Sequence, residues 1–171
     1  HPRYTEIIQL VDMAVSRLLL RPSAPDASLY SIQSLLLYFQ WMPYDLYSPN
    51  SSTTHTQIEF KTRYNEMSTW FVFGIALRYA SFFGLEQKAL STFGDEFGAV
   101  HATKEDLENM RVWLNIVTYD CNLTLTSGMP ASLRAEPTNT AAYKFCSHHA
   151  AQRPGDLRYA SMVSWLTLSR I

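Results

Sequence analysis

The sequence predicts an all-α fold, a bundle-like array of about five long helices, and three observations lead to this expectation. Apolar residues recur at spacings of three and four along several segments, which is the period of a helix with one buried face. No strand pattern competes with this helical period in any segment of the 171 residues. Proline or glycine ends most of the periodic segments, as at helix termini. We therefore expect one helical domain over residues 1–171.

The first expected helix runs from about Tyr4 to Leu20. Pro22 and Pro25 follow it, and proline cannot continue a helix. Its predicted buried face carries Ile7, Val11, Ala14 and Leu18.

The second helix begins near Ser28, where Asp26 or Ser28 can accept a hydrogen bond from a first-turn amide. It ends before Pro43, and residues 44–57 are expected to form a polar loop. Because the helix is apolar on two sides, it is predicted to lie in the interior. The two stripes are Leu29, Ile32, Leu36 and Phe39, and Leu35, Tyr38 and Met42.

The third helix is expected from about Thr62 to Phe83. Glycine inside a helix costs about 1 kcal/mol relative to alanine, so we expect a neighbouring helix to pack closely against Gly74. Gly84 suits the left-handed residue just past the helix end. The predicted stripe is Trp70, Phe73, Gly74, Leu77 and Ser81.

The fourth long helix starts at Thr103, whose hydroxyl can cap it, and is ended by Gly128 and Pro130. Residues 86–102 are expected to be irregular apart from a short helix, and residues 131–153 to be polar and loose. A last helix follows residues 154–156 and continues to Leu168. The apolar residues of the fourth helix keep helical spacing throughout: Leu107, Met110, Leu114, Val117, Cys121 and Leu125.

The composition narrows the classes of function. Hydrophobic residues make up 47% and charged residues 17% of the chain, and the formal net charge is -1. The scattered Lys and Arg residues do not form the basic cluster that duplex DNA requires, and no apolar run is long enough to span a membrane. Cys121 and Cys146 lack the spacing of a zinc or redox motif. We expect no metal site, and His148-His149 is interpreted as part of a solvated loop.

No enzymatic motif is present. Ser127-Gly128 does not form a nucleophile elbow, and no glycine-rich phosphate loop occurs. The sequence therefore predicts a protein that is not an enzyme.

Three segments together resemble a known family. Residues 28–37 read SLYSIQSLLL, residues 70–85 read WFVFGIALRYASFFGL, and residues 105–130 carry Arg111, Trp113 and Asp120 before the run SGMP. In this order the segments resemble the middle homology region of fungal zinc-cluster transcription factors. The resemblance covers residues 28–130. Glu86 and Met129 depart from it, because the family commonly has His and Arg at these positions.

The resemblance implies a function. In the family this helical region is associated with sensing small molecules and with restraining or permitting activation of transcription in the nucleus. The DNA-binding module of the family uses six cysteines to hold zinc, whereas this chain has two. The resemblance therefore implies a regulatory fragment without zinc or other cofactor and without direct DNA contact. The segments also look like regulators of aromatic amino-acid catabolism.

Asp120 is the most informative polar residue, because it lies among apolar residues on a helix predicted to be buried. A buried carboxylate needs partners, and Arg78 is the natural candidate, with Arg111 as the alternative. The pair is interpreted either as a structural link between two helices or as a ligand anchor.

A set of aromatic residues suggests either an ordinary core or an apolar cavity between helices. If an amino-acid-like effector binds there, its carboxylate would require an arginine, and Arg78 fits better than Arg17, Arg21 or Arg158, which lie near element ends. The hypothetical ligand-binding residues are Arg78 and Asp120 with Trp70, Tyr79, Trp113 and Tyr38.

Two functions remain open from the sequence. The first is an effector-sensing domain whose ligand is an aromatic amino acid or another apolar metabolite. The second is an interaction scaffold that docks onto other parts of the same transcription factor, or onto a second copy as a homodimer, without a small ligand. The low content of charged residues is compatible with both functions.

Overall fold

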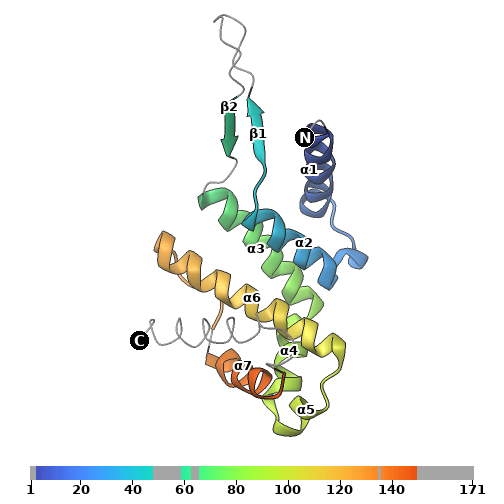
Figure 1. Cartoon of the computed structure of the whole chain (residues 1–171), viewed down its shortest axis with the longest axis vertical. Coiled ribbons are helices and arrows are strands. Elements are labelled where there is room, and N and C mark those ends of the chain that lie inside the picture. Colours follow the sequence, from blue (N-terminus) through green and yellow to red (C-terminus); the bar gives the residue numbers. More distant parts are fainter. Residues whose placement is uncertain (1–2, 48–58, 63–65, 135, 150–171) are drawn as a thin grey trace, which may run out of the picture. The chain divides into compact units, whose positions relative to one another are not determined.

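The computed structural model describes residues 3–47, 59–62, 66–134 and 136–149. The chain forms two compact units, His1–Tyr79 and Ala80–Ile171. Within the described residues there are seven α-helices, one 3-10 helix and one short β-hairpin (Figure 1). The helical class is thus confirmed, whereas the expected number of about five helices is too low.

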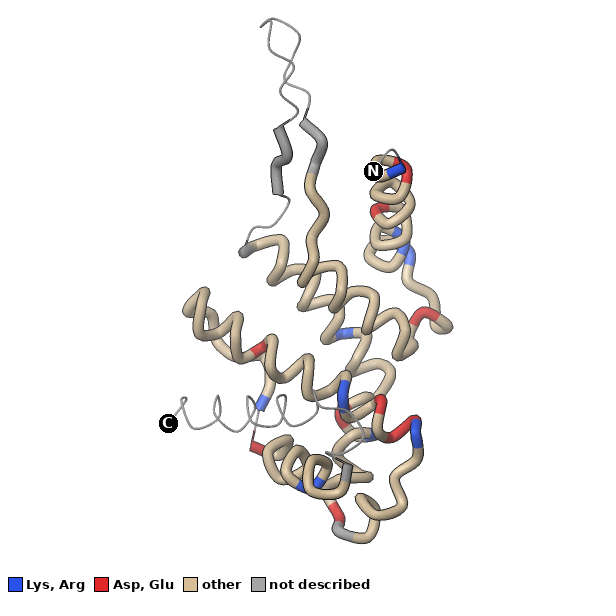
Figure 2. Tube along the Cα trace, viewed as in Figure 1, with Lys and Arg blue, Asp and Glu red and all other residues tan. Residues whose placement is uncertain are grey.

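The first unit contains three α-helices and the hairpin. Helix α2 has no charged residue (Figure 2). The boundary with the second unit falls inside α3, so this helix contributes residues to both. The elements in chain order are α1 (Tyr4–Leu20), the 3-10 helix η1 (Ala24–Asp26), α2 (Leu29–Gln40), β1 (Tyr44–Tyr47), β2 (Glu59–Thr62) and α3 (Glu66–Phe83).

Helix α2 is buried on one side only, and the prediction of an interior helix holds for that side, since Tyr30 and Leu37 are 80% and 59% exposed. It begins after Ser28, whose hydroxyl accepts a hydrogen bond from the Ser31 amide at 3.3 Å. The ring of Phe39 packs edge-on against Phe73 of α3, with 5.5 Å between centroids. The residues of α2 that are fully or almost fully buried are Ile32, Leu35, Leu36 and Phe39.

Two predicted apolar faces are wrong in detail. Ile7 of α1 is 52% exposed, and Leu18 is the buried residue among those described in this helix. In α3, Trp70 is 40% exposed, and Ser81 is also exposed. Both helices carry apolar residues around most of their circumference, so periodicity alone could not select the face that is covered. In α3 the buried residues are Thr69, Val72, Phe73, Ala76, Tyr79 and Ala80.

The hairpin corrects the expectation of a loop without strands at residues 44–57. Strand β1 pairs antiparallel with β2, with Tyr44 opposite Thr62 and Tyr47 opposite Glu59. The third helix, expected from Thr62, begins at Glu66. Each strand has four residues, so the pattern was too short to stand out from the Ser- and Thr-rich surroundings.

The second unit contains more helices than the sequence predicted. Residues 86–102 were expected to be irregular apart from one short helix and residues 131–153 to be loose, yet these stretches contain α4, α5 and α7. The last expected helix, over residues 154–168, lies outside the described residues. Helix α4 packs against both α6 and α7, and buries Leu85, Ala89 and Phe93 at helical spacing of four. The bounds are α4 (Leu85–Gly94), α5 (Glu96–Val100), α6 (Lys104–Ser127) and α7 (Glu136–His149).

The ends of the helices follow the predicted signals closely. The Thr103 hydroxyl accepts a hydrogen bond from the Asp106 amide at 3.2 Å, and Asp106 bonds back to the Thr103 amide at 2.9 Å. This reciprocal capping box starts α6. Gly84 and Gly128 both adopt a φ of 70°, in the left-handed region that glycine tolerates. The predictions for these positions are confirmed.

The expectation of a close neighbour at Gly74 is wrong for the described residues. A β-carbon built there would meet its nearest atom, Nη1 of Arg78, at 3.5 Å, an ordinary contact. At Gly98, by contrast, a β-carbon would collide with the carbonyl oxygen of Thr92.

Replacing Gly74 with alanine should therefore raise the free energy of unfolding by about 0.5–1 kcal/mol, because alanine is the better helix former and finds room. The matched change Gly98→Ala should lower it by about 1–3 kcal/mol through overpacking. Urea unfolding followed by circular dichroism measures both. Equal effects of the two substitutions would contradict this account.

Candidate functional site

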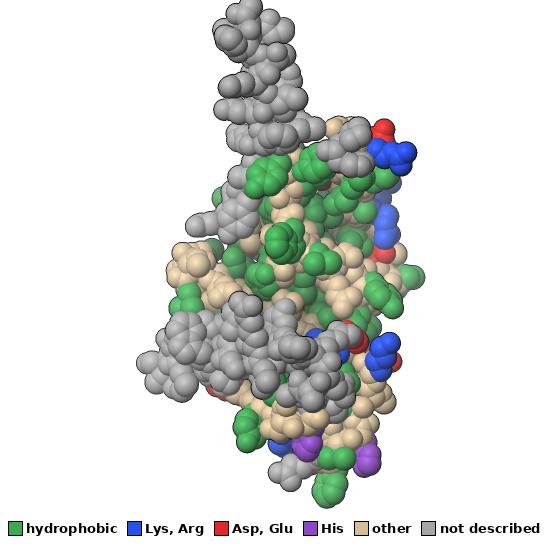
Figure 3. All heavy atoms as spheres, in the orientation of Figure 1, with side chains coloured by type: hydrophobic (Ala, Val, Ile, Leu, Met, Phe, Trp, Pro, Cys, Tyr) green, Lys and Arg blue, Asp and Glu red, His purple; other side chains and the backbone are tan. Residues whose placement is uncertain are grey.

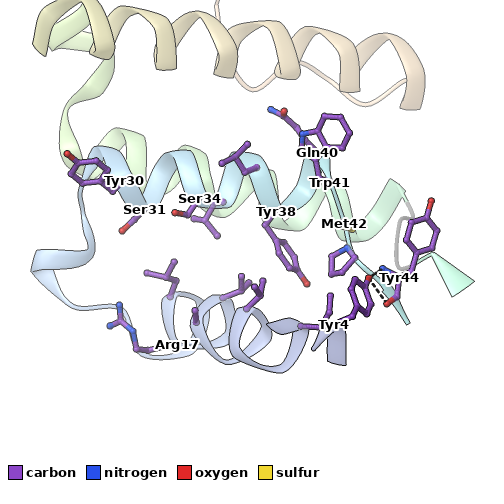
Figure 4. A pocket seen from close by; sticks show the side chains of 18 residues that line it. Tyr4, Arg17, Tyr30, Ser31, Ser34, Tyr38, Gln40, Trp41, Met42 and Tyr44 are labelled. Atoms are coloured by element: carbon purple, nitrogen blue, oxygen red, sulfur yellow. Dashed lines mark hydrogen bonds between the residues drawn. The ribbon is translucent and has the colours of Figure 1, made fainter. Parts of the chain in front are cut away.

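A groove of about 1100 Å³ lies in the first unit, between α1 and α2 (Figure 4). Helix α1 provides one wall, and α2 with the segment that follows it to Tyr44 provides the other. The lining is mostly apolar, and hydrophobic side chains are also visible at the surface of this unit (Figure 3). Its apolar lining includes Ile8, Val11, Ala14, Val15 and Leu18 of α1 and Leu35, Leu37, Trp41, Met42 and Pro43 on the other side.

The N-terminal end of α1 is attached through one tyrosine. The Tyr4 hydroxyl donates to the carbonyl oxygen of Tyr44 at 3.1 Å, and accepts from the Tyr44 amide at 2.9 Å. Both bonds join residues that line the groove, and Figure 4 shows them at one end of it. This double hydrogen bond therefore fastens α1 to the first residue of β1.

The C-terminal end of α1 is attached by two further interactions. The Tyr79 hydroxyl of α3 donates to the Leu18 carbonyl oxygen at 2.8 Å, in a buried position. Burial raises the pKa of Tyr79, so this hydroxyl keeps its proton as a donor. Arg17 forms a two-pronged ion pair with Asp26 of η1, with 3.0 Å between Nη1 and Oδ2. Helix α1 is thus held at both ends, with the groove between.

Among the described carboxylates of this unit, Asp26 has the most strongly shifted pKa. The guanidinium of Arg17, together with the Ser23 hydroxyl at 2.6 Å and the Ser23 amide at 2.8 Å, holds its pKa far below the usual range. The same hydrogen bond and charge raise the pKa of Arg17. The pair is therefore ionised at neutral pH, and each charge compensates the other.

The Arg17–Asp26 pair predicts a pH dependence of stability. A carboxylate whose pKa is depressed by folding stabilises the protein above its unfolded pKa of about 3.9, and this contribution is lost as the pH falls below it. The melting temperature of the wild type should therefore exceed that of Asp26→Asn at pH 7, and the gap should narrow below about pH 4. Thermal scans from pH 7 to pH 3 measure it. A gap that stays constant over this range would contradict the prediction.

The structure places the predicted ligand residues of the first unit at different positions. Tyr38 lines the groove, as expected of a cavity residue. Tyr79 contacts α1 through its hydroxyl, and Trp70 is 40% exposed, with its ring edge-on to the neighbouring Phe71. None of the described lining is contributed by Trp70, Tyr79 or Arg78.

The sequence suggested Arg78 as the arginine that would bind a ligand carboxylate, but Arg78 does not line the groove. Its side chain is exposed and donates to the carbonyl oxygen of Gly74, one turn earlier in its own helix, at 3.0 Å. Arg17, which seemed too close to a helix end, lines the groove instead. The end of α1 turns out to lie beside α2, and this neighbourhood could not be inferred from chain position.

Asp120 lies in the second unit and is buried, as predicted, with an exposed fraction of 3%. Its carboxylate accepts hydrogen bonds from the Ser132 amide at 3.0 and 3.1 Å and from the Leu133 amide at 3.0 Å. The sequence had suggested Arg78 or Arg111 as its partner. By accepting these hydrogen bonds, Asp120 fastens the segment after Gly128 to α6. Backbone amides have no signature in the sequence, which is why this role was missed.

The other predicted residues of the second unit have structural partners. The indole nitrogen of Trp113 donates to the buried Thr138 hydroxyl of α7 at 3.0 Å. Arg111 pairs with Glu108 on the same helix at 3.2 Å. The first contact links α6 to α7, and the second joins two side chains within α6.

The described residues contain no cluster of three or more His, Cys, Asp or Glu side chains that could hold a metal ion. Among the described helices, none combines the length and apolar character of a membrane span. The arrangement in the first unit can bury apolar surface and offer hydroxyl groups for hydrogen bonds. Fold and site together define a helical protein with a ligand-sized groove between two helices.

Comparisons with protein-family models, with curated proteins and with solved structures found no match.

Proposed function

We propose that this chain is an effector-sensing regulatory domain, in which a small molecule binds the groove between α1 and α2. The groove itself is the observation that supports the proposal. Its volume of about 1100 Å³ is slightly above the usual range of about 300–1,000 Å³ for small-molecule sites. A ligand there would cover apolar side chains of both helices, a gain of roughly 25 cal/mol per Å² buried.

The attachment of α1 provides a route from binding to regulation. Leu18 is the buried residue among those described in this helix, so α1 contributes little to the core. Hydrogen bonds and an ion pair near its two ends hold it over α2. A ligand that contacts both helices would bind best the arrangement in which α1 is held beside α2, and would shift the population toward it. The position of α1 would then depend on whether the effector is bound, and α1 would transmit this binding to the rest of the protein.

The resemblance to fungal zinc-cluster transcription factors supports the wider context. Under this proposal the domain belongs to a nuclear factor that controls metabolic genes, with amino-acid catabolism as a candidate process. Zinc and DNA contact would belong to a separate module of that factor. The domain would carry out no chemistry, and its partners would be the effector and other parts of the factor.

A thermal-shift experiment tests the sensing proposal. A panel of hydrophobic and aromatic metabolites, including aromatic amino acids, should contain a compound that raises the melting temperature with saturable dose dependence. Ala14 is exposed and lines the groove, so Ala14→Trp should obstruct the groove and abolish the shift. No shift with any compound, or an unchanged shift in Ala14→Trp, would reject the groove as an effector site.

An interaction scaffold is the second candidate, and the outer side of α1 favours it. Leu10 and Met13 are each 61% exposed, and Ile7 is 52% exposed, which leaves an apolar surface on this helix. A scaffold would use that surface to bind a second copy or another part of the factor. Light scattering after size-exclusion chromatography should then show a dimer that Leu10→Glu dissociates. A monomer at all concentrations would count against self-association.

A further inference from the structure

We propose that the groove between α1 and α2 selects an uncharged, mainly apolar molecule that carries a single hydrogen-bonding group, and that it rejects carboxylates of the same shape. This inference rests on the proposed function and narrows it. The observations that carry it are the charge balance of the lining and the position of one tyrosine hydroxyl.

The charge balance comes from the ion pair at one end of the groove. Among the described residues that line it, Arg17 is the only charged one. Its guanidinium makes two contacts with the carboxylate of Asp26, which is also held by Ser23. The positive charge of Arg17 is therefore already compensated within the protein. A ligand carboxylate would lose its hydration in an apolar groove without gaining an uncompensated cation.

The hydrogen-bonding group is expected to meet Tyr38. Figure 4 shows the Tyr38 side chain extending from α2 toward α1, across the groove. The side chain is half-buried, and its hydroxyl has no hydrogen-bond partner within the described part of the chain. The hydroxyl of Tyr4, near the N-terminal end of α1, differs in this respect, because it is engaged with the backbone of Tyr44. A neutral ligand hydroxyl or carbonyl would complete the hydrogen bonding of Tyr38.

Three probes with one skeleton separate the effect of charge from that of shape. At pH 7, 1-naphthalenemethanol is neutral, 1-naphthoate is an anion and 1-naphthylmethylamine is a cation. Calorimetric titration of the full chain with each probe measures affinity. We expect the alcohol to bind at least tenfold more tightly than either ion.

Two variants locate the recognition within the groove. Tyr38→Phe should weaken binding of the alcohol about 2- to 10-fold, as loss of one hydrogen bond would. The matched control Tyr143→Phe, on an exposed tyrosine of α7, should leave the affinity unchanged. Asp26→Asn removes the compensating charge and should raise the affinity for 1-naphthoate relative to the alcohol. Melting temperatures of each variant confirm that it is folded.

The outcomes distinguish this inference from the proposed function. If 1-naphthoate binds the wild type as tightly as the alcohol does, and Ala14→Trp blocks it, the groove is a ligand site and the inference of neutral selectivity is wrong. The inference is also overturned if folded Asp26→Asn rejects the anion as strongly as the wild type does. If none of the three probes binds, the inference fails, while the metabolite panel decides the proposed function separately.

Discussion

Replacing Phe145 with alanine should lower the free energy of unfolding by about 3–5 kcal/mol, the usual cost of deleting a buried phenylalanine side chain. Phe145 is on α7 and has an exposed fraction of 0%. Its ring packs edge-on against Phe93 of α4, with 5.3 Å between centroids, and the guanidinium of Arg111 lies 5.8 Å from its centroid. Truncation would leave a cavity among α4, α6 and α7. Urea unfolding followed by far-ultraviolet circular dichroism measures the loss.

The matched control is Tyr143→Ala on the same helix. Tyr143 is 74% exposed, so its truncation removes a comparable ring with little burial. We expect this control to change the free energy of unfolding by no more than about 0.5 kcal/mol. Similar losses for both variants would indicate that α7 does not pack as described, and would restore the expectation of a loose segment at residues 131–153.

Replacing Asp120 with alanine should lower the free energy of unfolding by about 2–3 kcal/mol, because hydrogen bonds to a charged group are stronger than neutral ones. The carboxylate holds the amides of Ser132 and Leu133, and its loss leaves these donors without their acceptor. The segment between Gly128 and α7 should then exchange its amide hydrogens faster. Hydrogen exchange at Ser132 and Leu133, together with urea unfolding, measures both effects.

Two further variants separate charge from general damage. Asp120→Asn keeps one oxygen acceptor, so it should lose about half as much stability as the alanine variant. Glu105→Gln alters an exposed acidic residue on the same helix and should cost no more than about 0.5 kcal/mol. If Asp120→Ala leaves the exchange of both amides unchanged, Asp120 does not fasten this segment.

The elements that the sequence predicted best have strong local signals. Helix α1 spans the expected residues, because Pro22 and Pro25 follow its periodic segment and end it. Helix α6 begins at the Thr103 capping box and ends at the left-handed Gly128, both of which act within one turn. One short helix was expected where α4 and α5 lie, and the second was missed because Gly94 and Gly98 resemble loop residues. In α7, polar residues outnumber apolar ones, so its own sequence gives a weak helical signal. Packing against α4 and α6 therefore decides the structure of this segment.

The candidate site was less predictable than the fold. Tyr38 was identified as a cavity residue, and Asp120 was correctly expected to be buried. The groove arginine was not identified, because Arg17 gains its position from the packing of α1 beside α2 and from Asp26. Pairing between distant residues depends on which faces meet, and helical periodicity carries no information about that choice.

The sequence by itself determined the helical class, the buried side of α2 and the ends of α1 and α6. These properties depend on residue periodicity and capping, which act over a few neighbouring positions. The tertiary structure alone decided which side of α1 and α3 is covered, that α7 belongs to the core, and that Asp120 binds backbone amides. It also decided that a groove remains between α1 and α2. These outcomes depend on contacts between segments far apart in the chain, where packing outweighs local preference.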